Sequence, residues 1–130
     1  MIHNNELKNA VILKAAPSKL DGTGEMAEVQ VIDAHTGETL LNPLLAPATG
    51  LDADAAEAYG LPTDYLDGPV KPGSYPDYED RLKALLVGNV VLMDADEVTA
   101  NLLVNSAKAH NRPTGWIENL AMAHRVPAIA

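Results

Sequence analysis

The sequence predicts an α/β fold in which a three-stranded antiparallel meander is followed by helices and at least one further strand. Three observations predict it. Short strand-like segments separated by turns occupy the first third of the chain, Ala- and Leu-rich segments with helix-capping signals follow, and an apolar run returns between two of those helices. A length of 130 residues suits one hydrophobic core, so we expect residues 1–130 to form a single domain.

The first two strands are marked by their apolar patterns. Residues 9–16 (NAVILKAA) place three large aliphatic side chains in a row ahead of Pro17, which is typical of a buried strand. Residues 27–34 (AEVQVIDA) alternate polar and apolar side chains with a period of two, which indicates a strand with one wet face.

A hairpin turn at residues 35–38 leads into the third strand. Gly37 lies in this turn and can adopt the positive φ that such turns use. Residues 39–45 then return as a strand, and Pro43 within it favours an edge position or a bulge because proline has no backbone donor.

Helices are predicted on both sides of a Pro-, Gly- and Tyr-rich loop at residues 62–76. Residues 52–59 open with an aspartate and close at Gly60, which predicts a short helix with a glycine stop. After the loop, Ser74 with Asp77 three residues later predicts a helix start, and a Leu-rich stripe continues the helix.

The last third of the chain predicts one strand and two helices. Residues 89–93 (NVVLM) have the composition of a buried strand. Residues 94–110 are predicted to form a long helix that stops before Pro113, and residues 114–124 a final helix.

Composition restricts the function and the setting. Nine basic against 18 acidic residues give a formal charge of −9, so a nucleic-acid partner is disfavoured and anionic membranes are repelled. No apolar run approaches the roughly 20 residues of a membrane helix, and the N-terminal residues show no signal peptide. We therefore expect a cytoplasmic protein, or a component of an assembly formed there.

The order of the elements and several motifs resemble the core of the proofreading-type (DEDD) 3′-to-5′ exonucleases of the ribonuclease H-like superfamily. The resemblance runs from about Val11 to Leu120. Residues 32–38 (IDAHTGE) are similar to that family's Thr-Gly-Glu hairpin. Residues 55–61 (AAEAYGL) resemble its Ala-x-x-x-His-Gly-Ile element, with Tyr59 at the histidine position. Residues 90–102 (VVLMDADEVTANL) resemble Val-Val-x-His-Asn-Ala-x-Phe-Asp-x-x-x-Leu.

The resemblance implies a ribonuclease H-like domain that has lost its catalytic carboxylates. Such enzymes hold two divalent metals that position the attacking water. On the family's Asp-x-Glu-Thr-Thr-Gly-Leu motif, Lys14 falls on the first carboxylate, Ala16 on the second, and Val98 on a later aspartate. The family's closing His and Asp have no copy before Ala130, so the domain is truncated at its C-terminal end relative to the family. We expect no enzyme activity, no metal and no cofactor.

Two other acidic arrangements could bind a metal. In a competing register Asp33 would be the first ligand, but residues 11–16 would then lie outside the fold. Asp94, Asp96 and Glu97 cluster at a predicted helix start, where acidic residues ordinarily interact with the helix dipole. We prefer the capping interpretation, because the spacing is not that of a calcium loop.

The aromatic residues are the candidates for partner binding. Tyr65, Tyr75, Tyr78 and Trp116 either form a recognition surface, where such rings contribute much contact area, or seal the aliphatic core. The preferred function is a catalytically inactive, exonuclease-like protein-binding or assembly module, within a homo- or hetero-oligomer. The alternatives are an acidic inhibitor that mimics nucleic acid and a divergent metal-dependent nuclease.

Overall fold

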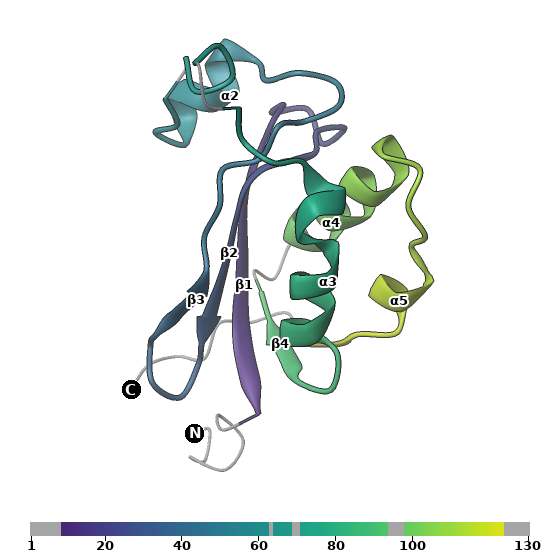
Figure 1. The fold of residues 1–130 in the computed structure, drawn as a ribbon. Helices are drawn as coiled ribbons and strands as arrows, with labels where there is room; N and C mark the ends of the chain where they lie inside the picture. The colour runs from purple at the N-terminus through teal and green to yellow at the C-terminus, as the bar shows by residue number, and fades with distance from the viewer. Residues whose placement is uncertain (1–8, 63, 69–70, 94–97, 124–130) are drawn as a thin grey trace.

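Two eight-residue strands form the centre of the sheet in the computed structural model, which describes residues 9–62, 64–68, 71–93 and 98–123. The fold is mixed α/β, and its larger helices lie against one side of a five-stranded sheet (Figure 1). No helix among these residues is long and apolar enough to cross a membrane. In chain order, the elements are β1 (Ala10–Pro17), β2 (Met26–Asp33), β3 (Thr39–Leu41), α2 (Ala53–Ala58), α3 (Tyr75–Leu86), β4 (Val90–Leu92), α4 (Val98–Ala109), α5 (Gly115–Glu118) and β5 (Ala121–Ala123).

The sheet confirms the predicted meander. Its strand order is β3-β2-β1-β4-β5; β1, β2 and β3 pair antiparallel, whereas β4 pairs parallel to β1 and β5 parallel to β4. The third strand ends at Leu41, ahead of Pro43, and lies at the sheet edge with a register shift between Val31 and Ile32 of its neighbour. The predicted strand at residues 39–45 is therefore too long, because Pro43 lies beyond β3. The edge position, one of the two alternatives drawn from the proline, is confirmed.

The core lies between the sheet and the helices α3 and α4. Val11 and Leu13 of β1 and Val29 and Val31 of β2 point to the same face, since Leu13 pairs with Val31. They pack with the buried leucines of the two helices, Leu82, Leu86, Leu102 and Leu103. Each such side chain contributes roughly 1.5–3 kcal/mol when it leaves water.

The helix α3 begins as its capping signal predicts. Asp77 Oδ2 accepts a 2.8 Å hydrogen bond from the backbone N–H of Ser74, which completes one half of a capping box. Because α3 begins at Tyr75, the predicted loop at residues 62–76 ends two residues early. The predicted helix at residues 94–110 is α4 over its described part; residues 94–97 lie outside the described residues.

The predicted final helix at residues 114–124 is wrong. The chain makes only the short helix α5 and then the strand β5, in which Ala121 pairs with Val90. The apolar run at residues 120–123 fits either a helix or a strand by its pattern. The open edge of β4 decides between them, because parallel pairing there satisfies the backbone groups of β5.

Candidate functional site

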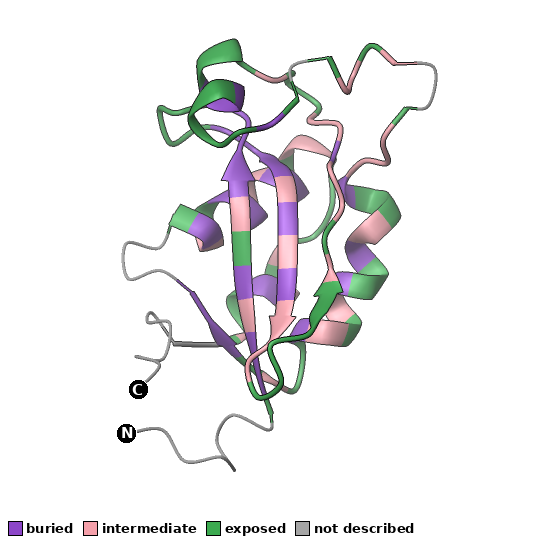
Figure 2. Cartoon of the chain, turned by 90° about the vertical axis from the view of Figure 1, so that its left-hand side faces the viewer, coloured by how far each residue is buried: buried purple, intermediate pink, exposed green. Residues whose placement is uncertain are grey.

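Among the described residues, one face of the central strands is covered by a helix only at one end, where α2 packs on Ala16. The pairing of Ile12 with Ile32 and of Lys14 with Gln30 places these four side chains on the face opposite α3 and α4. Glu28, paired with Ala16, lies on the same face. We call these five side chains, Ile12, Lys14, Glu28, Gln30 and Ile32, the open face; the strands that carry them face the viewer in Figure 2.

A cavity of about 340 Å³ lies where the open face meets the end of α2. Tyr59, the C-terminal cap residue of α2, is 50% exposed and forms one wall. The cavity is lined by Lys14, Ala15, Ala16, Glu28, Gln30 and Tyr59. The structure thus brings together Lys14, Ala16 and Tyr59, which the resemblance to the exonucleases singled out separately.

Lys14 and Glu28 are the charged side chains of this cavity. Across residues 9–62, 64–68, 71–93 and 98–123, neither the Lys14 ammonium nor the Glu28 carboxylate has a hydrogen-bond or ion-pair partner. Glu28 nevertheless acts at a distance on Tyr65: burial first, and then the negative charge of Glu28, raise the pKa of the Tyr65 hydroxyl to about 12.

Ala16 lies beneath α2. Its side chain is 5% exposed and packs in a small cluster with Ala56 of α2 and Leu61 just beyond it. A longer, charged side chain at position 16 would have to displace these groups. At the position that the resemblance assigns to the second carboxylate, the side chains of Ala56 and Leu61 therefore leave no room for a carboxylate.

Two further residues considered as metal ligands lie apart from this cavity. Val98, the first residue of α4, is 41% exposed and does not line it. Asp33 ends β2 and uses its Oδ1 to accept hydrogen bonds from the backbone N–H groups of His35, at 2.8 Å, and Thr36, at 3.1 Å. Its carboxylate thus organises the hairpin turn.

Within the described part of the chain, no group of three or more His, Cys, Asp or Glu side chains is arranged to hold a metal ion. The acidic cluster Asp94, Asp96 and Glu97 lies outside the described residues.

The four aromatic candidates do not share one surface. Tyr75 is 1% exposed, so it is a core residue and not part of a contact surface. Tyr78 and Trp116 are partly buried against the main core. Tyr65 donates a 2.8 Å hydrogen bond to the Leu45 carbonyl, which fixes the loop that carries it. Each of the four residues thus makes contacts within the fold, and Tyr65, Tyr78 and Trp116 are also partly exposed.

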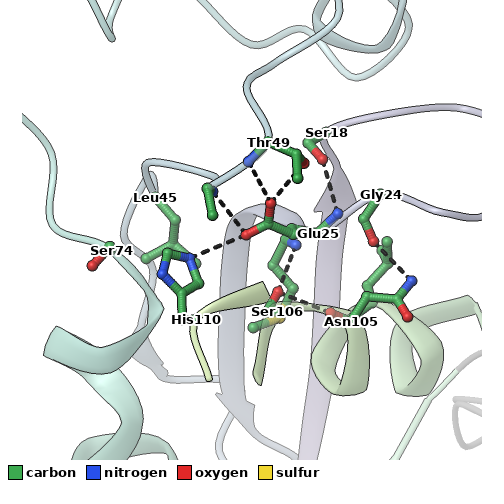
Figure 3. Close-up of polar contacts among 12 residues, drawn as sticks. Ser18, Gly24, Glu25, Leu45, Thr49, Ser74, Asn105, Ser106 and His110 are labelled. Carbon is green, nitrogen blue, oxygen red and sulfur yellow. Dashed lines mark hydrogen bonds and ion pairs between the residues drawn. The ribbon is translucent and has the colours of Figure 1, made fainter. Parts of the chain in front are cut away.

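Sequence reasoning missed a buried polar cluster around Glu25 (Figure 3). Its carboxylate accepts hydrogen bonds from the backbone N–H groups of Ala48, at 2.9 Å, and Thr49, at 2.8 Å, and from Thr49 Oγ1 at 2.7 Å. His110 Nε2 lies 3.1 Å from Glu25 Oε1. A lone glutamate before a strand gives no sequence signal of this role.

Two buried serines complete the cluster. Ser18 Oγ accepts from the backbone N–H of Glu25 at 2.8 Å, and Ser106 Oγ accepts from that of Met26 at 2.9 Å. Both hydroxyls are closed off from solvent. We therefore interpret the cluster as a structural junction of β2, α4 and the loop before α2, and not as a nucleophilic site.

A second buried carboxylate, Glu79, lies on the apolar side of α3. Arg112 donates to Glu79 Oε1 through Nε at 2.9 Å and also through Nη2. These hydrogen bonds hold the pKa of Glu79 below its usual range and raise the pKa of Arg112. Burial, and then the charge of Glu79, raise the pKa of the Tyr75 hydroxyl. A sequence signal existed, because Glu79 falls on the same helical stripe as Leu82 and Leu86.

A larger hollow of about 540 Å³ lies elsewhere on the surface, beside α5 and the start of β4. Its walls are apolar or amide side chains, among them Val87, Trp116 and Asn119, and no titratable side chain lines it. Because it offers no charge or nucleophile, it is less suited than the open face to specific chemistry.

A comparison with protein-family models finds no model that matches the chain, and a comparison with curated proteins finds no matching sequence.

Proposed function

We propose that this chain is a catalytically inactive, exonuclease-like domain of ribonuclease H-like topology that serves as a protein-binding or assembly module through its open face. The observation that carries the proposal is the state of two positions on β1. Among the residues that the structure describes, the Lys14 ammonium has no hydrogen-bond or ion-pair partner, and Ala16 packs against Ala56 of α2.

The topology supports the exonuclease-like part of the proposal. An antiparallel meander followed by helices and further strands is the arrangement that the resemblance implies, and β1 to β5 follow it. Under that resemblance, Lys14 and Ala16 stand where carboxylates would hold metal. A lysine ammonium repels a divalent cation, and the space at Ala16 is filled by α2.

The composition of the open face supports the binding part. Apolar Ile12 and Ile32 lie beside the polar Lys14, Gln30 and Glu28, and no described helix covers them. Interfaces between proteins commonly combine apolar contact with a few placed polar groups. A sheet face that combines two isoleucines with one amide and two oppositely charged side chains suits a protein partner better than a nucleic-acid backbone, given the net charge of −9.

A nuclease assay tests the loss of catalysis. The purified chain is incubated with single-stranded DNA or RNA and Mg²⁺ or Mn²⁺, and we expect no metal-dependent degradation. Degradation that is abolished in Asp33→Ala would overturn the proposal and favour a divergent nuclease.

Site-specific photo-crosslinking tests the binding surface. A photoreactive residue replaces Gln30 on the open face, and a matched variant carries it at Asn101, an exposed position on α4. We expect protein adducts from position 30 that are lost in Lys14→Glu, and none from position 101. Equal adducts from both positions, or none from position 30, would contradict a binding role for the open face.

A further inference from the structure

The open face carries one positive and one negative side chain, and each lacks a partner within the described chain. Lys14 is exposed and Glu28 is partly buried, and both line the same cavity. Resting on the proposed function, we infer that the partner of this face is a second copy of the chain. In the resulting dimer, Lys14 of each protomer pairs with Glu28 of the other.

The strand register makes the face self-complementary in charge. Lys14 pairs with Gln30 and Ala16 with Glu28, so Lys14 and Glu28 are diagonal neighbours on adjacent antiparallel strands. Diagonal positions of this kind lie roughly 7–8 Å apart. A two-fold axis that lies between two stacked faces, and passes between these side chains, brings each lysine over a glutamate of the other protomer. Such an isologous contact forms both ion pairs with one operation.

The remaining side chains favour the same partner. Ile12 and Ile32 pair across β1 and β2 and supply apolar area beside the charges. Two chains of formal charge −9 repel each other, so a second copy can dock only where opposite charges meet across the interface. The open face offers that meeting point.

The size of the face sets the expected affinity. Eight-residue strands are about 27 Å long and lie about 4.8 Å apart. The two strands alone offer well under the roughly 800 Å² per partner of a standard interface, so we expect a weak, transient dimer that is detected only towards the upper end of the concentration range below.

Charge reversal with complementation tests the pairing. Sedimentation is measured for the wild-type chain, for Lys14→Glu, for Glu28→Lys, and for an equimolar mixture of the two variants, between about 1 and 200 μM. We expect the wild-type chain to dimerise. Each single variant should dimerise at least about 100-fold more weakly, because symmetry places like charges in contact twice. The mixture should regain dimer, because both contacts of the heterodimer then join an acidic side chain of the Lys14→Glu chain to a basic side chain of the Glu28→Lys chain.

Matched variants control for net charge and folding. Lys108→Glu and Glu118→Lys make the same charge changes at exposed positions on α4 and α5 and should leave the dimer unchanged. Circular dichroism checks that every variant is folded. Recovery of the dimer in the mixture of Lys14→Glu and Glu28→Lys would show independently that both of these variants are folded.

Two results would overturn the inference. A wild-type chain that stays monomeric throughout the concentration range excludes the second copy. A dimer that the single reversals leave intact lies on another surface. Neither result decides the proposed function, which fails instead on metal-dependent nuclease activity or on the absence of adducts from position 30.

Discussion

The carboxylate of Glu25 and the imidazole of His110 join the start of β2 to the end of α4, with 3.1 Å between Oε1 and Nε2. The same carboxylate accepts the backbone N–H groups of Ala48 and Thr49. One buried side chain therefore ties the sheet, a helix and the loop that leads to α2. Buried carboxylates are tolerated only when such partners replace water.

Removing this carboxylate should destabilise the fold. In Glu25→Ala, two backbone donors and the Thr49 hydroxyl lose their acceptor, so we expect a loss of about 3 kcal/mol or more in the free energy of unfolding. His110→Ala removes one partner and should cost less than half as much. Urea unfolding monitored by circular dichroism measures both. A loss in Glu25→Ala no larger than in His110→Ala would show that the loop contacts contribute little.

Ser106 should matter through one hydrogen bond to the sheet. Its Oγ accepts from Met26 N–H at 2.9 Å and donates to Leu102 O at 2.8 Å. Ser106→Ala leaves the Met26 N–H without its acceptor, so we expect a loss of about 1–3 kcal/mol in unfolding free energy. The neighbouring Asn105→Ala, whose bonds to Gly22 and Gly24 are more exposed, is the matched control and should lose less. Equal losses of unfolding free energy in the two variants would show that the substitutions act through the helix α4 and not through the hydrogen bond from Met26 N–H to Ser106.

The stability contributed by Glu79 should depend on pH. Arg112 lowers the pKa of Glu79, so the stabilisation is present above the unfolded pKa of about 4.3 and is lost as the pH falls through the lower folded value. The wild-type chain should therefore exceed Glu79→Gln in stability at pH 7, and this difference should shrink below about pH 4.3. Urea unfolding at pH 7 and pH 3 measures it, with Glu57→Gln on the exposed side of α2 as control. A difference that stays constant between the two pH values would contradict the role of the ion pair.

Substitution by alanine should change the stability of the fold in opposite directions, or only in one case, at two glycines. A Cβ at Gly24 would lie 2.7 Å from the backbone nitrogen of Lys19, so Gly24→Ala must shift the loop before β2 and should destabilise the fold. A Cβ at Gly115 meets nothing within 4 Å, and this residue begins α5. Gly115→Ala should therefore be neutral or stabilise by up to about 1 kcal/mol. Thermal unfolding compares the two, and a stabilised Gly24→Ala would refute the close packing at that turn.

The central part of the fold could be predicted because local signals agree with it. Val29 and Val31 alternate with polar residues, Ser74 and Asp77 form a capping pair, and the chain after α2 turns at Gly60, which has a φ of +68°. Each signal is carried by a few adjacent residues. The strand β5 had no such signal, since it exists because β4 offers Val90 as a pairing partner from a distant part of the chain.

The candidate site was predictable only in part for a similar reason. Lys14, Ala16 and Tyr59 were singled out through motifs along the chain, and all three line the cavity. For Glu28 and Gln30, the sequence predicts only that they lie on the solvent-facing side of a strand. The register with β1 places them beside Lys14, and a register is set by long-range pairing.

The position of Trp116 gives the molecule an internal reporter. It is the single tryptophan of the chain, packs against the main core from α5, and has Lys83 Nζ 5.7 Å from its ring centroid. The core that it contacts lies on the face of the sheet opposite Lys14 and Glu28. The fluorescence of Trp116 should change when the helical layer unfolds and should not change when a partner binds the open face. Unfolding can therefore be measured by fluorescence in an unlabelled sample without interference from association.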